Sequence, residues 1–84
     1  MKQVILDGNY ITTRAQLHDA LSEQLQLPEW YGRNLDALYD CLGEMRDVEI
    51  LLRSWPREGY LARAMDLMLD AARENPGLRI YIAA

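Results

Sequence analysis

Three carboxylates recur at every fourth position between residues 36 and 44, the spacing that places side chains on one face of a helix. Asp36 and Asp40 would lie along the outside of a helix that begins near Leu35, and Glu44 would join them if that helix runs one residue past Gly43. Like charges four residues apart destabilise a helix by about 0.2–0.5 kcal/mol per pair. Asp36 is compensated locally, because an acid in the first turn complements the helix dipole, whereas Asp40 and Glu44 are not. An uncompensated acidic row predicts a functional surface that receives cationic groups.

A later helix carries the compensated version of the same pattern. Asp66 and Asp70 are also four residues apart, but Arg63 precedes the first by three positions and Arg73 follows the second by three. These arginines are expected to neutralise their acids. The acidic row of the earlier helix has no such base within it.

Aromatic side chains surround the first acidic row. Trp30 and Tyr31 precede Gly32 in a loop, and Tyr39 shares the helix face of the carboxylates. Tryptophan and tyrosine are enriched at the centres of protein interfaces, so exposed rings grouped with carboxylates predict a protein-binding site. The alternative is structural, because an acidic row is commonly a solvated helix face and aromatic residues of a small domain commonly fill its core.

Catalytic chemistry fits these residues less well. Asp36 and Asp40 could form an acid/base couple, but such couples work in a cleft, and both are expected on a convex helix. Together with Glu44 they could bind a divalent metal, although no ligand converges on them from another segment. His18, the single histidine, is expected to be half-buried or at the surface, and nothing in the spacing brings Cys41 to it as a nucleophile.

Composition and charge limit the function classes further. The 84 residues are half hydrophobic and carry a net charge of −4, with eight acids and two bases between residues 19 and 49. An acidic half repels phosphate backbones, so direct binding of nucleic acid is disfavoured. No apolar run approaches the ~20 residues of a membrane span, and the N-terminal apolar stretch is too short for a signal peptide. A single cysteine forms no intrachain disulfide, which predicts a cytoplasmic protein.

Hydrophobic periodicity and capping signals predict six elements. Residues 3–6 read as a strand that stops at the Asp7-Gly8-Asn9 turn. A helix over about 14–26 follows a capping box, buries a leucine stripe and is ended by Pro28. A second helix is capped by Asn34 and ends near Gly43. A strand from residue 48, a helix from 60 to about 75 and a strand over 78–83 complete the chain.

This element order predicts an α/β fold. One domain over residues 1–84 would contain a three-stranded parallel sheet covered by helices, with right-handed crossovers. In the third helix the stripe expected to face the core consists of Leu61, Met65, Met68 and Ala72. Trp55 is expected in the core as well.

The stretch LPEWYGRNLDALYDCL, residues 27–42, resembles the signature of the barstar family, the intracellular inhibitors of the ribonuclease barnase. The order of nine consecutive positions, 34–42, is matched, and VILDG at 4–8, LHDAL at 17–21 and the aliphatic closing strand are similar too. The resemblance covers the whole chain. It implies a barstar-like fold, with three parallel strands and about three to four helices on the faces of the sheet.

The resemblance also implies which residues bind the nuclease. Asp40 matches an aspartate that occupies the site of the substrate phosphate, and Asp36 matches an acid that pairs with an arginine of the enzyme. Trp30 matches a ring that packs on the catalytic histidine. Gly32 and Asn34 match positions of close main-chain contact. The full predicted interface consists of Trp30, Tyr31, Gly32, Arg33, Asn34, Leu35, Asp36, Tyr39, Asp40, Gly43 and Glu44.

Four positions of the predicted interface depart from the family pattern. The reference member has tyrosine at Trp30 and tryptophan at Tyr39, an exchange that changes ring size but not role. Arg33 replaces an acid and reverses one charge of the predicted interface, which would favour a nuclease with an acid opposite. Gly43 replaces a threonine. An acid of the last helix also makes a contact in the family, and here Asp70 or Glu74 would have to supply it.

The expected function is therefore a non-enzymatic, cytoplasmic inhibitor without a cofactor. It would occlude the basic active site of a secreted or toxin ribonuclease in a 1:1 complex. Two alternatives stay open: an immunity or antitoxin protein that uses the same face against a different toxin nuclease, and a small carboxylate-dependent metal enzyme.

Overall fold

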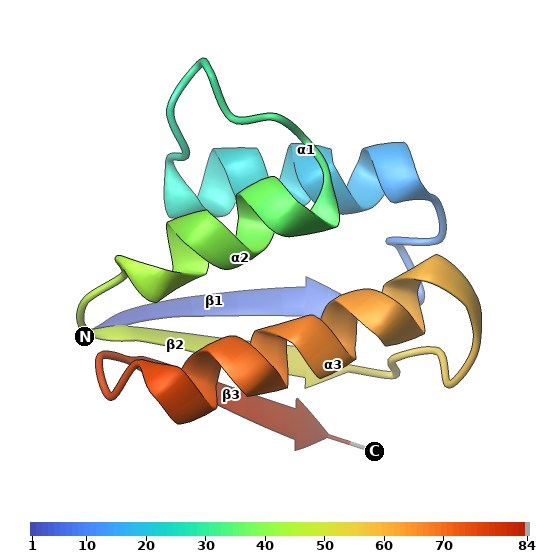
Figure 1. Cartoon of the computed structure of the whole chain (residues 1–84). Coiled ribbons are helices and arrows are strands. Elements are labelled where there is room, and N and C mark those ends of the chain that lie inside the picture. The colour runs from blue at the N-terminus through green and yellow to red at the C-terminus, as the bar shows by residue number, and fades with distance from the viewer. Residues whose placement is uncertain (84) are drawn as a thin grey trace.

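The computed structural model of the chain describes residues 1–83, which form three strands and three helices (Figure 1). The order is the predicted one, and the α/β fold is confirmed. The elements are β1 (Lys2–Asp7), α1 (Arg14–Leu25), α2 (Leu35–Gly43), β2 (Val48–Arg53), α3 (Gly59–Glu74) and β3 (Leu78–Ala83).

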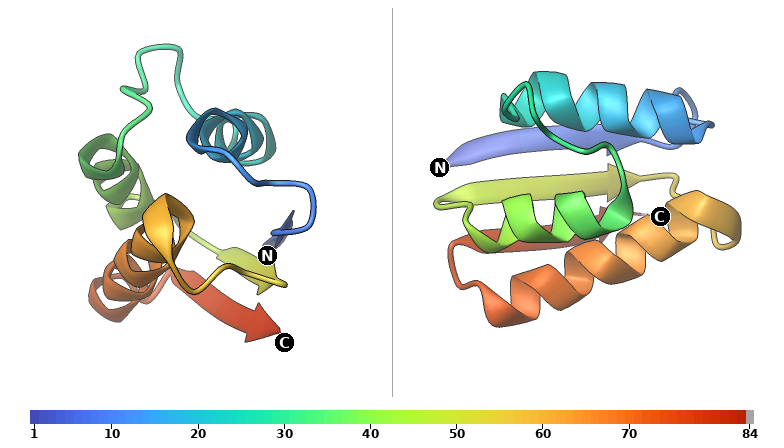
Figure 2. Two further views of the ribbon diagram at one scale, coloured as in Figure 1. Left: turned by 90° about the vertical axis from the view of Figure 1, so that its right-hand side faces the viewer. Right: turned by 45° about the horizontal axis from the view of Figure 1, so that its top comes forward.

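The sheet is fully parallel, with β2 between β1 and β3, as predicted. In register, Ile50 of β2 lies between Val4 of β1 and Ile80 of β3. All three helices cover one face of this sheet, as the view along the strands shows (Figure 2). The expectation that helices would lie on the faces of the sheet is therefore fulfilled on one face only. On the other face, Ile5 and Tyr81 are each about half exposed.

Local sequence signals set the helix ends. Thr13 and Gln16 form the predicted capping box at the start of α1. The side chain of Asn34 accepts a hydrogen bond from the Ala37 amide at 2.8 Å and so caps α2. α1 ends at Gln26 in the left-handed conformation, two residues before the proline that was expected to end it. No helix among residues 1–83 is long and apolar enough to cross a membrane.

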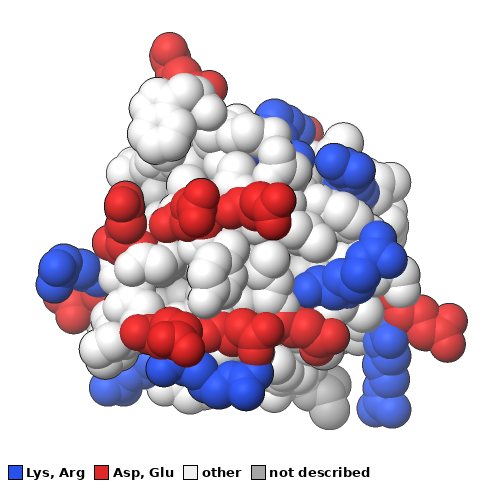
Figure 3. All heavy atoms as spheres, in the orientation of Figure 1, with Lys and Arg blue, Asp and Glu red and all other residues white. Residues whose placement is uncertain are grey.

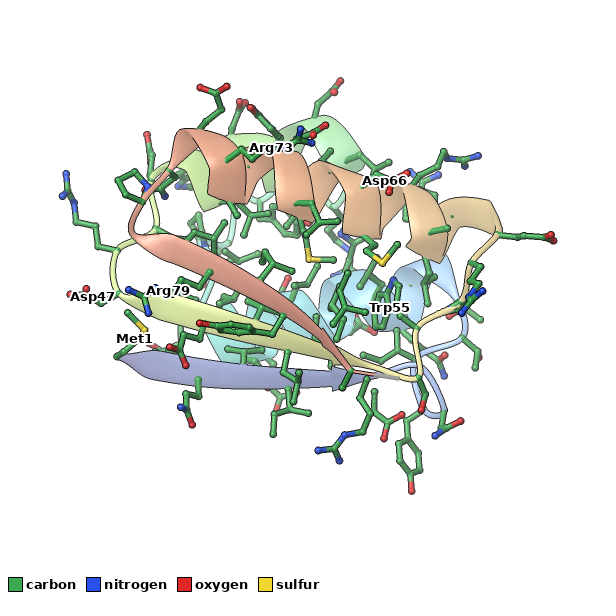
Figure 4. All side chains as sticks on the ribbon, turned by 90° about the horizontal axis from the view of Figure 1, so that it is seen from below. Met1, Asp47, Trp55, Asp66, Arg73 and Arg79 are labelled. Atoms are coloured by element: carbon green, nitrogen blue, oxygen red, sulfur yellow. The ribbon has the colours of Figure 1, made fainter. Side chains whose placement is uncertain are left out.

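The core lies between the sheet and the helices. α1 buries Leu17, Leu21 and Leu25, the predicted stripe. Trp55 lies between the sheet and α3 (Figure 4), where its indole N–H donates to the Leu61 carbonyl at 2.8 Å. The buried stripe of α3 is rotated slightly from the predicted one. It consists of Leu61, Ala64, Met68 and Ala71, while Met65 and Ala72 are half-buried.

Two glycines make a matched pair for testing this packing. A Cβ added to Gly8 would lie 2.1 Å from the Ser54 carbonyl oxygen, whereas one added to Gly43 meets nothing within 4 Å. Gly8→Ala should therefore lower the free energy of unfolding by about 1–3 kcal/mol through overpacking. Gly43→Ala should raise it by up to about 1 kcal/mol, because alanine favours a helix. Urea unfolding of both variants measures these two changes in the free energy of unfolding. Equal changes would contradict the close approach of Gly8 to the Ser54 carbonyl.

Candidate functional site

The outer face of α2 carries the predicted acidic row. Asp36 and Asp40 are exposed, as is Glu44 just beyond the end of the helix. On the opposite side, Leu38 and Leu42 are fully buried. The predicted outward orientation of the α2 carboxylates is thus confirmed.

Within residues 1–83, these carboxylates have no ion-pair partner. Among residues 1–83 the ion pairs join Arg33 to Asp19 and Arg73 to Asp70. Neither pair involves an acid of α2, so its carboxylates remain open to a partner from outside.

A second acidic row, on α3, lies beside the first. Figure 3 shows two rows of acidic side chains over α2 and α3, with mostly uncharged side chains between them and a basic side chain at one end. A groove of about 570 Å³ separates the helices and is lined by Asp36, Tyr39, Asp40, Arg63, Asp66, Leu67 and Asp70. The i, i+4 spacing on α3 was visible in the sequence. Its proximity to α2 was not, because it depends on how the two helices pack.

The prediction that arginines would neutralise the α3 row is half right. Arg73 is ion paired with Asp70. Arg63 instead lies over the ring of Tyr60, 5.7 Å from its centroid, and is not ion paired with Asp66. Asp66 lies on the side of α3 away from the sheet (Figure 4), so its charge adds to the acidic surface.

A second groove, of about 540 Å³, lies between α2 and the preceding loop. Its lining residues are Trp30, Tyr31, Gly32, Ala37, Asp40, Cys41 and Glu44. Trp30 is 80% exposed and Tyr39 is 37% exposed, so two of the three predicted rings are at the surface. Asp40 lines both grooves, which places it at the centre of the acidic and aromatic surface.

The third ring departs from the prediction. Tyr31 is only 6% exposed, because its ring turns into the core. Its hydroxyl is 2.6 Å from Nδ1 of His18, and Nε2 of the same histidine is 2.8 Å from the Tyr60 hydroxyl. His18 was expected to be half-buried or at the surface, but it is 1% exposed. Both residues were expected to be more exposed than they are, and both expectations were wrong. The hydroxyl of Tyr31 and the ring of His18 can be buried because they form a hydrogen bond with each other.

The remaining predicted loop residues shape the backbone. The side-chain amide of Asn34 makes two local hydrogen bonds. Its Oδ1 accepts from the Ala37 N–H, and its Nδ2 donates to the Gly32 carbonyl at 3.3 Å. A Cβ at Gly32 would lie 3.2 Å from that amide nitrogen and 3.3 Å from the Ala37 Cβ, so glycine lets the loop pack against α2. Leu35 is half-buried against the core. Arg33 reaches back to α1, where Nη2 is 2.7 Å from Oδ1 of Asp19.

Cys41 is half-buried and lines the second groove, at the edge of the site. Burial raises the pKa of its thiol, and the nearby carboxylates of Glu44 and Asp40 raise it further. The thiol is therefore held in its protonated, weakly nucleophilic form. No group of three or more His, Cys, Asp or Glu side chains within residues 1–83 is placed to hold a metal ion.

Fold and surface together define a class, a small α/β domain that presents an acidic helix and an aromatic loop. The chain belongs to the family described as Barstar (barnase inhibitor), whose model matches residues 1–83. A Bacillus subtilis (strain 168) protein named "Putative ribonuclease inhibitor YrdF" is 44% identical over 52 residues. That match spans 62% of this chain and 57% of the relative's length.

The buried histidine generates a pH prediction. Burial lowers the pKa of His18 below its ordinary value of 6.5, and the positive charges of Arg33 and Arg14 lower it further, against an opposing effect of Asp19. Below pH 6.5 the unfolded chain binds a proton that the folded chain does not. The free energy of unfolding should therefore fall as the pH falls toward the folded-state pKa, by no more than about 1.4 kcal/mol per pH unit.

Nuclear magnetic resonance of the single histidine measures this pKa directly. We expect a midpoint below 6.5, and a flatter stability profile between pH 6.5 and about pH 5 for His18→Gln, where most carboxylates stay ionised. A midpoint at or above 6.5 would contradict the burial of this ring.

Proposed function

We propose that the protein is a ribonuclease inhibitor that covers the active site of its target with α2 and the loop over residues 26–34. The observation that carries this proposal is the position of Asp40. Its carboxylate is exposed, has no ion-pair partner among residues 1–83 and lies where two grooves meet. Membership of a family described as barnase inhibitors supports the same function.

The physical basis is mimicry of RNA by carboxylates. A ribonuclease binds a polyanion, so its active site is lined with cationic groups before the substrate arrives. Carboxylates at phosphate-like positions satisfy those groups, while Trp30 and Tyr39 supply apolar area around them. Attraction between opposite charges also speeds encounter and weakens with salt, a behaviour for which barnase and barstar are a standard example.

The α3 row widens this surface. Asp70 is already ion paired with Arg73, whereas Asp66 and Glu74 make no ion pair within residues 1–83. Of these two acids, Asp66 lines the groove beside α2 and is free there to attract a basic partner. We place Asp66 at the edge of the interface and Asp40 at its centre. The proposed complex contains one inhibitor and one nuclease and forms in the cytoplasm.

A second candidate is an immunity or antitoxin protein against a toxin nuclease other than barnase. It is favoured by the absence of an acid at position 33, because Arg33, whose guanidinium is paired with Asp19, stands where the family pattern has an acid. The same face would be used, and only the charge pattern of the target would differ.

Inhibition is tested by titrating the protein into RNA cleavage by barnase and by a panel of basic ribonucleases and toxin nucleases. We expect cleavage by at least one nuclease to stop at one inhibitor per enzyme. The heat-unfolded chain should not inhibit, which controls for a non-specific polyanion effect. If micromolar protein slows none of these nucleases, the proposal is wrong.

The central carboxylate should dominate the affinity. Asp40→Ala leaves cationic groups of the nuclease buried without a partner, so we expect a loss of at least about 2 kcal/mol, or about thirtyfold in Kd. Glu58→Ala is the matched control, because Glu58 is exposed, makes no capping hydrogen bond and lies outside both grooves. Titration calorimetry measures both, and a change below threefold for Asp40→Ala would rule out its central role.

A further inference from the structure

Two side chains of the 26–34 loop attach it to the same turn of α1. Tyr31 points inward to His18, and Arg33 runs along the surface to Asp19, the next residue of α1. The guanidinium of Arg33 also reaches the carbonyl of Ala15, one turn earlier, at 3.4 Å. The loop therefore has one buried and one exposed attachment to a single short stretch of helix.

The buried attachment leaves little freedom. A neutral imidazole has one donor and one acceptor nitrogen, so the hydroxyls of Tyr31 and Tyr60 take opposite roles at His18. Every buried side-chain polar atom within residues 1–83 has a partner. Withdrawing Tyr31 would leave a ring nitrogen of His18 buried without one, which is unfavourable. The loop is thus held at residue 31 by a buried hydrogen bond.

The exposed attachment fixes the backbone beyond Gly32. Arg33 has a φ of 55°, in the left-handed region that residues with a Cβ seldom adopt. Such a conformation persists where surrounding contacts hold it, and the contacts of Arg33 are those with Asp19 and Ala15. An exposed ion pair contributes little to global stability. The effect of the Arg33–Asp19 pair is therefore local, on the backbone conformation at residue 33.

We propose that Tyr31 and Arg33 are positioning residues that hold the 26–34 loop on α1, so that Trp30 is presented to the nuclease in a preformed shape. The proposal rests on the proposed function and deepens it. Both residues were predicted to contact the partner, but Tyr31 is buried and the guanidinium of Arg33 is engaged by α1. Preformed loops bind more tightly because less freedom is lost on association.

The two tyrosines on His18 provide a matched experiment. Tyr31→Phe and Tyr60→Phe each remove one hydroxyl from the same histidine, but Tyr31 lies in the loop and Tyr60 in α3. Amide hydrogen exchange of the free protein, followed by nuclear magnetic resonance, reports loop opening without any partner. We expect exchange at residues 30–33 to accelerate about tenfold in Tyr31→Phe and to stay near the parent rate in Tyr60→Phe. Equal exchange in both variants would overturn the proposal.

The charge pair gives an independent test. Arg33→Asp and Asp19→Arg should each accelerate exchange of the loop amides, and the double exchange of charges should restore slow exchange at least in part. A residue that only contacts the partner would leave exchange in the free protein unchanged. Failure of the doubly exchanged variant to recover toward the parent rate would show that the pair does not hold the loop.

Binding to barnase connects loop shape to affinity. If the parent binds, Tyr31→Phe should raise the Kd of the complex about tenfold, and Tyr60→Phe should raise it less than threefold. This difference is expected even if both variants lose the same thermal stability. Unchanged affinity with a loosened loop would overturn the positioning role. If the parent does not slow barnase, the barnase form of the proposed function fails, while the exchange measurements still decide whether these residues hold the loop.

Discussion

The burial of Leu38 and Leu42 is the contact on which the surface of this protein depends. Each fully buried leucine stabilises the fold by about 1.5–3 kcal/mol. Repulsion between carboxylates four residues apart costs only about 0.2–0.5 kcal/mol per pair. The apolar contact therefore outweighs the charge repulsion by a wide margin. α2 can carry an acidic row that would be unfavourable on an isolated helix, and it carries that row in one fixed orientation.

Trp30 and Tyr31, neighbours in the 26–34 loop, lie in opposite environments. Trp30 is at the surface, where its ring is available to a partner. Tyr31 is buried and joins the loop to α1 and α3 through His18. Because the tyrosine hydroxyls satisfy both ring nitrogens, a histidine with no solvent contact is tolerated in the core. Hydrogen bonds inside the molecule thus attach the residue next to the exposed Trp30.

The one-sided sheet explains why the acidic surface is broad. Parallel sheets are commonly covered on both faces, but here all three helices share one face (Figure 2). α2 and α3 consequently pack side by side, and their acidic rows line a common groove. The acidic surface proposed to bind a partner thereby combines Asp36 and Asp40 with Asp66.

The sequence by itself determined the elements, the parallel α/β order and the outward row on α2. These follow from signals within a few residues of each other, such as the Thr13–Gln16 capping box and the Asn34 cap, and the motif over 27–42 identified the family. Tertiary structure alone decided that Tyr31 is buried on His18 and that α3 extends the acidic surface. The reason is separation along the chain: His18 meets partners 13 and 42 residues away. No local pattern encodes such meetings, because they depend on how whole helices pack over the sheet.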